Sequence, residues 1–165
     1  MLVLGIDPGT ALTGYALVAE QDGEPCLVEA GVVRTAASLS PGARLQEIYQ
    51  GLLALAQRMR PDAAAVEEVF FSRNVRTALA VGQARGVVLL AMADADVPVH
   101  EYKPTVVKET VTGYGAADKK QVQEMVRLLL RLTAVLRPDD AADAAAIAMC
   151  HLQCSRFARA VQEAG

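Results

Sequence analysis

Acidic side chains stand at three places where the surrounding sequence is otherwise apolar. They are Asp7 at the end of a short apolar run, Glu67 and Glu68 near the end of another, and Asp139, Asp140 and Asp143 in an alanine-rich stretch. Charged side chains are rarely buried unless they are paired or bind a metal ion. These acids are therefore the first candidates for chemistry.

The pattern of these carboxylates predicts a site for a hard divalent cation. On a helix, Asp140 and Asp143 project from the same face about 5–6 Å apart. Such a cluster of like charges is unstable unless cations neutralise it. Oxygen ligands without a histidine suit magnesium or manganese better than zinc. Two such ions about 3.5–4 Å apart can activate water and stabilise the leaving oxygen during in-line attack on a phosphodiester.

Each acid also has a simpler explanation when it is taken alone. Acids that follow a proline, as after Pro138, commonly cap a helix and interact with its dipole. Asp7, before a Pro-Gly pair, can be a turn residue. Glu67 and Glu68 alternate on a strand, so at most one of them faces the site. The coincidence across separate elements favours the metal site.

A second group of potential ligands is Cys150-His151-x-x-Cys154. It offers three ligands, whereas a closed zinc site usually needs four. We interpret these residues as small buried helix positions.

The elements that must position the acids alternate between strands and helices. Strands are expected at 2–7, 13–20, 26–33, 63–71 and 97–102, with a hairpin at Asp22-Gly23. Helices are expected from Pro41 to the Arg60-Pro61-Asp62 stop, over 74–95, from Lys103-Pro104, over 118–133, and from Pro138 through Gln153. This order indicates an α/β fold with a mixed sheet, in which the parallel strands follow crossover helices. The carboxyl ends of parallel strands and the helix N-termini then meet at one edge.

The charge of the chain is unevenly distributed along the sequence. The chain has 165 residues and a net charge of −3, with 53% apolar residues, which excludes intrinsic disorder. Residues 103–137 carry seven basic and three acidic side chains, a net charge of +4. We predict a single domain, 1–165, without a membrane span or signal peptide. Three cysteines without a disulfide framework indicate a cytoplasmic protein.

Four stretches of the sequence together resemble the RuvC-type Holliday-junction resolvases. They are LGIDPGTALTGYALV, AVEEVFFSRNVRTALAVGQARG, YKPTVVKETVTGYGAADKKQVQEMV and DDAADAAAIAMCH. The resemblance covers nearly the whole chain. It implies an RNase H-like fold, with a central five-stranded mixed sheet flanked by helices. It also implies a divalent-metal-dependent endonuclease, for which the carboxylate pattern favours magnesium or manganese and two ions in each active site. This enzyme nicks four-way junctions symmetrically in recombination and repair and leaves 5′-phosphate and 3′-hydroxyl ends.

The resemblance places the catalytic and metal-binding acids of the family on Asp7, Glu67, Asp140 and Asp143. Asp7 is expected to bridge the two ions, with Glu67 and Asp140 each holding one. Asp143 completes the site directly or through water. Asp139 is left as a capping or supporting acid.

Candidate DNA contacts fall in two regions. Phe70 is expected to stack on or wedge a base, whereas Phe71 is assigned to the core. Exposed cations at a helix start oppose the helix dipole unless a phosphate lies nearby. The contacts in these two regions are Phe70, Arg73, Asn74 and Arg76 in the first, and Lys108, Lys119 and Lys120 in the second. The resemblance supports Lys108 and Lys119, while Lys120 matches no lysine of the family.

Gly82 and Gly86 form a small-residue stripe on the helix over 74–95. The stripe can pack onto the protein's own sheet or onto another subunit. The resemblance implies a homodimer through this helix, and a two-fold dimer presents two equivalent sites to a junction. It also implies a branch-migration motor of the RuvA and RuvB type as a partner.

Three other functions compete with the junction endonuclease. An ATP-binding domain of the actin or sugar-kinase type shares the LGIDPGT opening, but it needs two similar halves. A catalytically inactive junction binder conflicts with the presence of all four acids. An RNase H-like nuclease that acts on another branched or hybrid nucleic acid is the nearest alternative.

Overall fold

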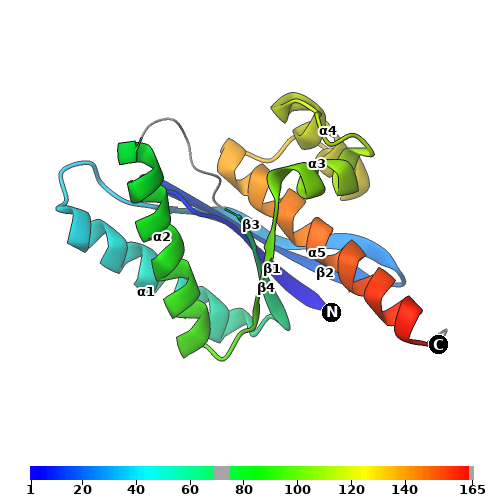
Figure 1. The fold of residues 1–165 in the computed structure, drawn as a ribbon, viewed down its shortest axis with the longest axis horizontal. Helices are drawn as coiled ribbons and strands as arrows, with labels where there is room; N and C mark the ends of the chain where they lie inside the picture. The colour runs from blue at the N-terminus through cyan, green and yellow to red at the C-terminus, as the bar shows by residue number, and fades with distance from the viewer. Residues whose placement is uncertain (69–74, 164–165) are drawn as a thin grey trace.

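A five-stranded mixed sheet forms the centre of the molecule (Figure 1). The computed structural model describes residues 1–68 and 75–163, with only the backbone for 75–77. The strand order is β3-β2-β1-β4-β5. β1 pairs antiparallel with β2 and parallel with β4, and β4 pairs parallel with β5. The strands are β1 (Leu2–Asp7), β2 (Leu12–Gln21), β3 (Glu24–Arg34), β4 (Ala63–Glu67) and β5 (Val99–Tyr102).

Helices cover both faces of the sheet. α1 and α2 lie against one face, and α5, with α3 and α4 beside it, lies against the other (Figure 1). Successive side chains along a strand point to opposite faces of the sheet, so each strand contributes to two hydrophobic cores. Val3 points toward α5, and its neighbour Leu4 points toward α1 and α2. The helices are α1 (Pro41–Met59), α2 (Val75–Asp94), α3 (Pro104–Thr112), α4 (Lys119–Leu129) and α5 (Asp139–Glu163).

Local sequence signals set several element boundaries. Asp22 and Gly23 both have positive φ angles (51° and 81°), which confirms the predicted hairpin between β2 and β3. The Ser40 side chain accepts a hydrogen bond from the Ala43 N–H and caps α1. Asp118 and Gln121 form a reciprocal capping box at the start of α4.

Several predicted boundaries are wrong. β4 ends at Glu67 instead of Phe71, and Phe71 lies outside the described residues. α4 ends at Leu129 instead of Thr133, because Arg131 has a left-handed backbone (φ 54°) that a helix does not continue. α5 continues ten residues beyond Gln153, where Arg156 and Arg159 form ion pairs with Glu20 of β2. No helix in the described part of the chain is long and apolar enough to cross a membrane.

Candidate active site

The register of two neighbouring parallel strands brings the first two acids together. Ile6 of β1 pairs with Val66 of β4, so Asp7 and Glu67 are the next residues on adjacent strand ends. On a strand the side chain after a buried residue points to the opposite face, so both carboxylates lie on the side of the sheet that α5 covers. This confirms the predicted convergence of the two strand ends.

Two strand glycines allow α5 to lie against the sheet closely enough to add its acids. A Cβ atom on Gly5 of β1 would stand 2.0 Å from the Ala144 carbonyl oxygen of α5. A Cβ atom on Gly14 of β2 would stand 2.0 Å from the Asp140 carbonyl oxygen. Any side chain at these positions would push the helix away. Gly14 pairs with Asp7 across β1 and β2, so the same contact places the first turns of α5 beside Asp7.

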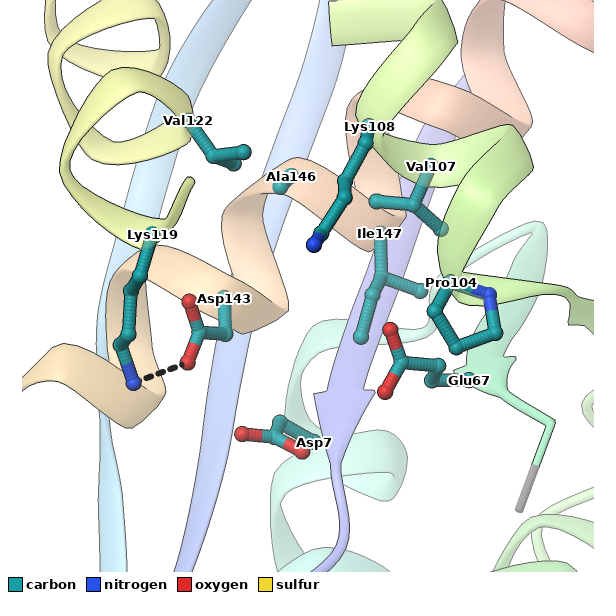
Figure 2. A pocket seen from close by; sticks show the side chains of 10 residues that line it. All are labelled: Asp7, Glu67, Pro104, Val107, Lys108, Lys119, Val122, Asp143, Ala146 and Ile147. Atoms are coloured by element: carbon teal, nitrogen blue, oxygen red, sulfur yellow. Dashed lines mark ion pairs between the residues drawn. The ribbon is translucent and has the colours of Figure 1, made fainter. Parts of the chain in front are cut away.

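These elements enclose a pocket of about 330 Å³ that is open to solvent. Figure 2 shows the carboxylates of Asp7, Glu67 and Asp143 around this pocket, with the Lys108 and Lys119 amines beside them. Apolar side chains from α3, α4 and α5 complete its wall. These are Pro104, Val107, Val122, Ala146 and Ile147.

The acids in this pocket repel one another strongly. Burial, followed by the negative charges of Asp143, Glu67 and Asp140, raises the pKa of Asp7 from 3.8 to about 7, while Lys119 opposes this shift. Burial and the charge of Asp143 also raise the pKa of Glu67, against the attraction of Lys108. Burial raises the pKa of Asp143 despite its hydrogen bond from Lys119. The site therefore favours any group that brings positive charge.

Lys119 supplies part of this positive charge. Its Nζ atom lies 2.7 Å from Asp143 Oδ2 and 3.8 Å from Asp139 Oδ2. Burial lowers the pKa of Lys119, but the hydrogen bond with Asp143 and the charges of three aspartates raise it overall. Asp139 is the first residue of α5 and also contacts Arg137.

The chemistry of the donors fits a divalent cation of the magnesium type. All the acidic donors here are carboxylate oxygens, which are hard ligands. The pKa of Asp7 is raised first by burial and then by the three neighbouring carboxylates, and a bound cation would relieve the second contribution. Among the described residues, no three acidic, histidine or cysteine side chains stand close enough to form a complete ligand group by themselves. The carboxylates thus share one pocket without a preformed cage.

The structure brings together five of the predicted site residues: Asp7, Glu67, Asp143, Lys108 and Lys119. Asp140 does not line the pocket, yet its charge acts on Asp7. Lys120 is exposed on another surface with Tyr114 and Met125. Phe70, Arg73 and Asn74 lie outside the described residues, and only the backbone of Arg76 is described.

The predicted small-residue stripe lies on a free face of α2. Gly82 and Gly86 are exposed, and a Cβ atom at either position would meet no described atom within 4 Å. Packing of these glycines onto the protein's own sheet is therefore excluded. Leu79 and Leu90 lie on the same helical face and are 64% and 54% exposed.

The Cys150–Cys154 segment is part of the packed structure, as the sequence interpretation proposed. Cys150 and His151 are buried on α5, and Cys150 Sγ donates a weak hydrogen bond to Thr110 Oγ1 at 3.6 Å. No metal-ligand group includes them within the described part of the chain.

Sequence reasoning missed two contributions to the site. It did not identify the ion pair between Lys119 and Asp143, because these residues lie on different elements. It also missed Gly5 and Gly14, although a glycine inside a strand is a known sign that another backbone approaches closely.

Comparison with known proteins relates this chain to one family. The family model described as "Crossover junction endodeoxyribonuclease RuvC" matches residues 3–151. The chain is 58% identical over 151 residues to the protein of that name from Chloroflexus aurantiacus, covering 92% of each chain. It is 56% identical over 160 residues to that from a Roseiflexus species, covering 97% of this chain and 95% of the other.

Two solved structures have the same fold. The structure of Thermus thermophilus RuvC matches with a TM-score of 0.89 and 40% identity, over 96% of this chain and 97% of that one. The same protein in complex with a Holliday junction substrate matches with a TM-score of 0.90 and 40% identity, over 96% of each chain.

Proposed function

The chain belongs to the RuvC family of crossover junction endodeoxyribonucleases, and we propose that it resolves Holliday junctions at the pocket bounded by Asp7, Glu67 and Asp143. The RNase H-like α/β fold that the sequence predicted is confirmed. A kinase-type function has no support, because the whole-chain relatives are nucleases. The observation that carries the proposal is the convergence of three carboxylates and two lysines on one solvent-open pocket.

Asp7, Glu67, Asp140 and Asp143 would hold the catalytic metal, with Mg²⁺ or Mn²⁺ as the ion and two ions in each site. If bound there, a divalent ion would supply a lowered pKa for water and positive charge opposite the reacting phosphate. Asp7 is the acid that we propose as the ligand shared by both ions. Its charge interacts with those of all three other carboxylates.

The chain itself contributes positioning and charge. Lys108 and Lys119 enter the pocket from α3 and α4, so their ammonium groups can bind a DNA phosphate beside the carboxylates. The apolar wall of Val107, Val122 and Ile147 reduces the local dielectric constant and strengthens these interactions. Phe70, Arg73, Asn74, Arg76 and Lys120 remain predicted DNA contacts.

We infer a homodimer that uses the free face of α2. Leu79, Gly82, Gly86 and Leu90 follow helical spacing along one exposed face, while Ala84 and Val88 on the other side are buried. Glycines on such a face let a second helix approach closely. A two-fold arrangement would give two active sites and paired symmetric nicks.

The dimer has a direct test. Gly86→Arg places a bulky charge on the face, where open space lets the chain fold normally, and is expected to convert the protein to monomers in light-scattering measurements. Gly42→Arg is the matched control, because Gly42 also has open space around it but lies on α1. A dimer that persists in Gly86→Arg would reject this interface.

The wider setting is also part of the proposal. We propose one domain over residues 1–165, recombination and repair as the process, and a RuvA- and RuvB-type motor as a partner. Three free cysteines fit a reducing compartment, and we propose the cytoplasm.

The decisive experiment compares a synthetic four-way junction with a linear duplex of the same sequence. Symmetric nicks with 5′-phosphate and 3′-hydroxyl ends are expected only in the junction and only with Mg²⁺ or Mn²⁺. EDTA should abolish cleavage and leave junction binding measurable. Equal cleavage of linear duplex, or cleavage only of a hybrid substrate, would instead support an RNase H-like nuclease with another substrate.

A further inference from the structure

Lys119 stands between two acids of α5 that belong to different parts of the site. Its amine lies 2.7 Å from Asp143, which lines the pocket, and 3.8 Å from Asp139, which does not (Figure 2 shows the first contact). The three side chains differ in exposure: 53% for Lys119, 28% for Asp143 and 41% for Asp139. Lys119 is thus the most exposed of the three, and the more buried of its two partners is the proposed metal ligand.

An ammonium group and a divalent ion compete for the same carboxylate. Both are attracted by the negative charge of Asp143, and each repels the other at short range. The lysine also lowers the negative potential at Asp7, the most perturbed acid of the site. A lysine in this position therefore stabilises the protein alone and opposes cation binding.

Asp139 gives the lysine a second position. It contacts Arg137 and carries charge that attracts Lys119, without entering the pocket. The Lys119 side chain is also half exposed, so a DNA phosphate can approach it from solvent. A short movement of one flexible side chain therefore connects three arrangements.

We propose that Lys119 is a positioning residue that moves between Asp143 and either Asp139 or a DNA phosphate, and so couples metal binding to DNA binding. This proposal rests on the proposed function and adds a role for Asp139. When DNA attracts Lys119 away from Asp143, the carboxylate becomes a better metal ligand. By linkage, metal at Asp143 strengthens the contact of Lys119 with DNA by the same factor.

The first test measures Mn²⁺ binding to the DNA-free protein, using the electron paramagnetic resonance signal of free Mn²⁺. Lys119→Met removes the competing charge and keeps the chain length, so it should bind Mn²⁺ more tightly, by roughly three- to tenfold for a half-exposed charge. Lys120→Met is the matched control, because it removes the same charge from the next residue, outside the pocket. It should change the affinity less than about twofold.

The second test asks whether Asp139 acts through the lysine. Asp139→Asn should weaken Mn²⁺ binding by roughly threefold in the natural chain, because Lys119 then stays on Asp143. In the Lys119→Met background, the same change should have almost no effect. A purely electrostatic effect of Asp139 on the metal would be equal in both backgrounds, and this additivity would reject the exchange.

The results separate the two proposals. Binding of Mn²⁺ to the natural chain with unchanged or weaker binding in Lys119→Met overturns the lysine exchange and leaves the nuclease proposal intact. If the natural chain binds no Mn²⁺ and Mn²⁺ does not raise its unfolding temperature, both the metal site and the exchange fail. Unfolding curves of every variant establish that each is folded, so an altered affinity reports on the site.

Discussion

Helix α5 carries two groups of polar side chains with opposite properties. Near its N-terminus, Asp140 and Asp143 add negative charge to a pocket that already holds Asp7 and Glu67. Two turns after Asp143, His151 lies in a cluster where each ring nitrogen has a partner. The same helix, packed on the same sheet, thus builds one site with excess charge and one that is neutral and complete.

The histidine cluster is closed by hydrogen bonds. His151 Nδ1 lies 2.7 Å from the Tyr102 hydroxyl, and Nε2 lies 3.1 Å from the Ser155 hydroxyl. The His100 ring packs beside it at 4.4 Å between centroids. Burial and the charge of His100 lower the pKa of His151 to about 4, so this ring is neutral at physiological pH. Such a network rigidifies the contact between α5 and β5.

The difference shows how the chain separates stability from function. A buried polar group with all its hydrogen bonds costs little and fixes a unique packing. Buried carboxylates that face one another destabilise the fold. Such groups are typical of functional sites, where the carboxylates bind cations and neighbouring lysines bind phosphates. Mutations of the acids should therefore raise stability and reduce cleavage, whereas mutations of the histidine cluster should lower stability and leave cleavage almost unchanged.

The largest expected effect follows from Asp7→Asn. This change removes the most crowded charge, so junction cleavage should fall by more than about a hundredfold, since even outer residues of metal sites cost 10–100-fold. At pH 8 the unfolding temperature should rise, because the repulsion from Asp143, Glu67 and Asp140 disappears. Cleavage assays and thermal unfolding in EDTA measure both effects. A less stable variant would mean that Asp7 is a structural residue.

The second prediction concerns the pH dependence of stability without metal. The folded-state pKa of Asp7 is raised from 3.8 to about 7, so its contribution to the unfolding free energy falls as pH rises through that interval. The pKa of His151 is lowered from 6.5 to about 4, so its contribution instead rises with pH between those values. From pH 4 to 6.5 the two contributions to the unfolding free energy therefore change in opposite directions, each by on the order of 3 kcal/mol.

Single variants should separate these slopes. Relative to the natural chain, Asp7→Asn should make the unfolding free energy rise more with pH from 4 to 6.5, because the falling contribution of Asp7 is removed. His151→Gln should instead make it fall more steeply over the same range, because the rising contribution of His151 is removed. Urea unfolding at several pH values, with EDTA present, provides the measurement. Equal slopes in the two variants would contradict the comparison between the clusters.

Sequence reasoning located the acids of the pocket, but it did not identify the glycines and the lysine contact that hold them in place. Asp7 and Glu67 follow apolar strands whose parallel pairing could be anticipated, so their convergence followed from periodicity and topology. The choice of Glu67 over Glu68 came from the resemblance, and Glu67 is the one of the two that lines the pocket.

What sequence reasoning could not supply depends on contacts between distant elements. The close approach of Gly14 to Asp140 requires the crossing of α5 over β2, which no local pattern encodes. The partners of His151 lie on β5 and one turn further along α5, so the sequence indicated that this segment is buried but not which groups bind its ring. The end of α4 depended on a left-handed residue, Arg131, whose side chain gives no such signal.

The smallest expected effect concerns the histidine cluster and the shorter of the two hydrogen bonds of His151. Tyr102→Phe removes the hydroxyl that lies 2.7 Å from His151 Nδ1 and keeps the ring that packs against α5. The unfolding free energy should fall by about 1–2 kcal/mol, because one buried ring nitrogen loses its partner. Junction cleavage should stay within about twofold of the natural chain, since no charge in the acidic pocket changes. Tyr114→Phe, on an exposed tyrosine, is the control for loss of a hydroxyl alone. A large loss of cleavage at unchanged stability would show that the two clusters on α5 act together, because a defect at β5 would then have to reach Asp143 through the helix.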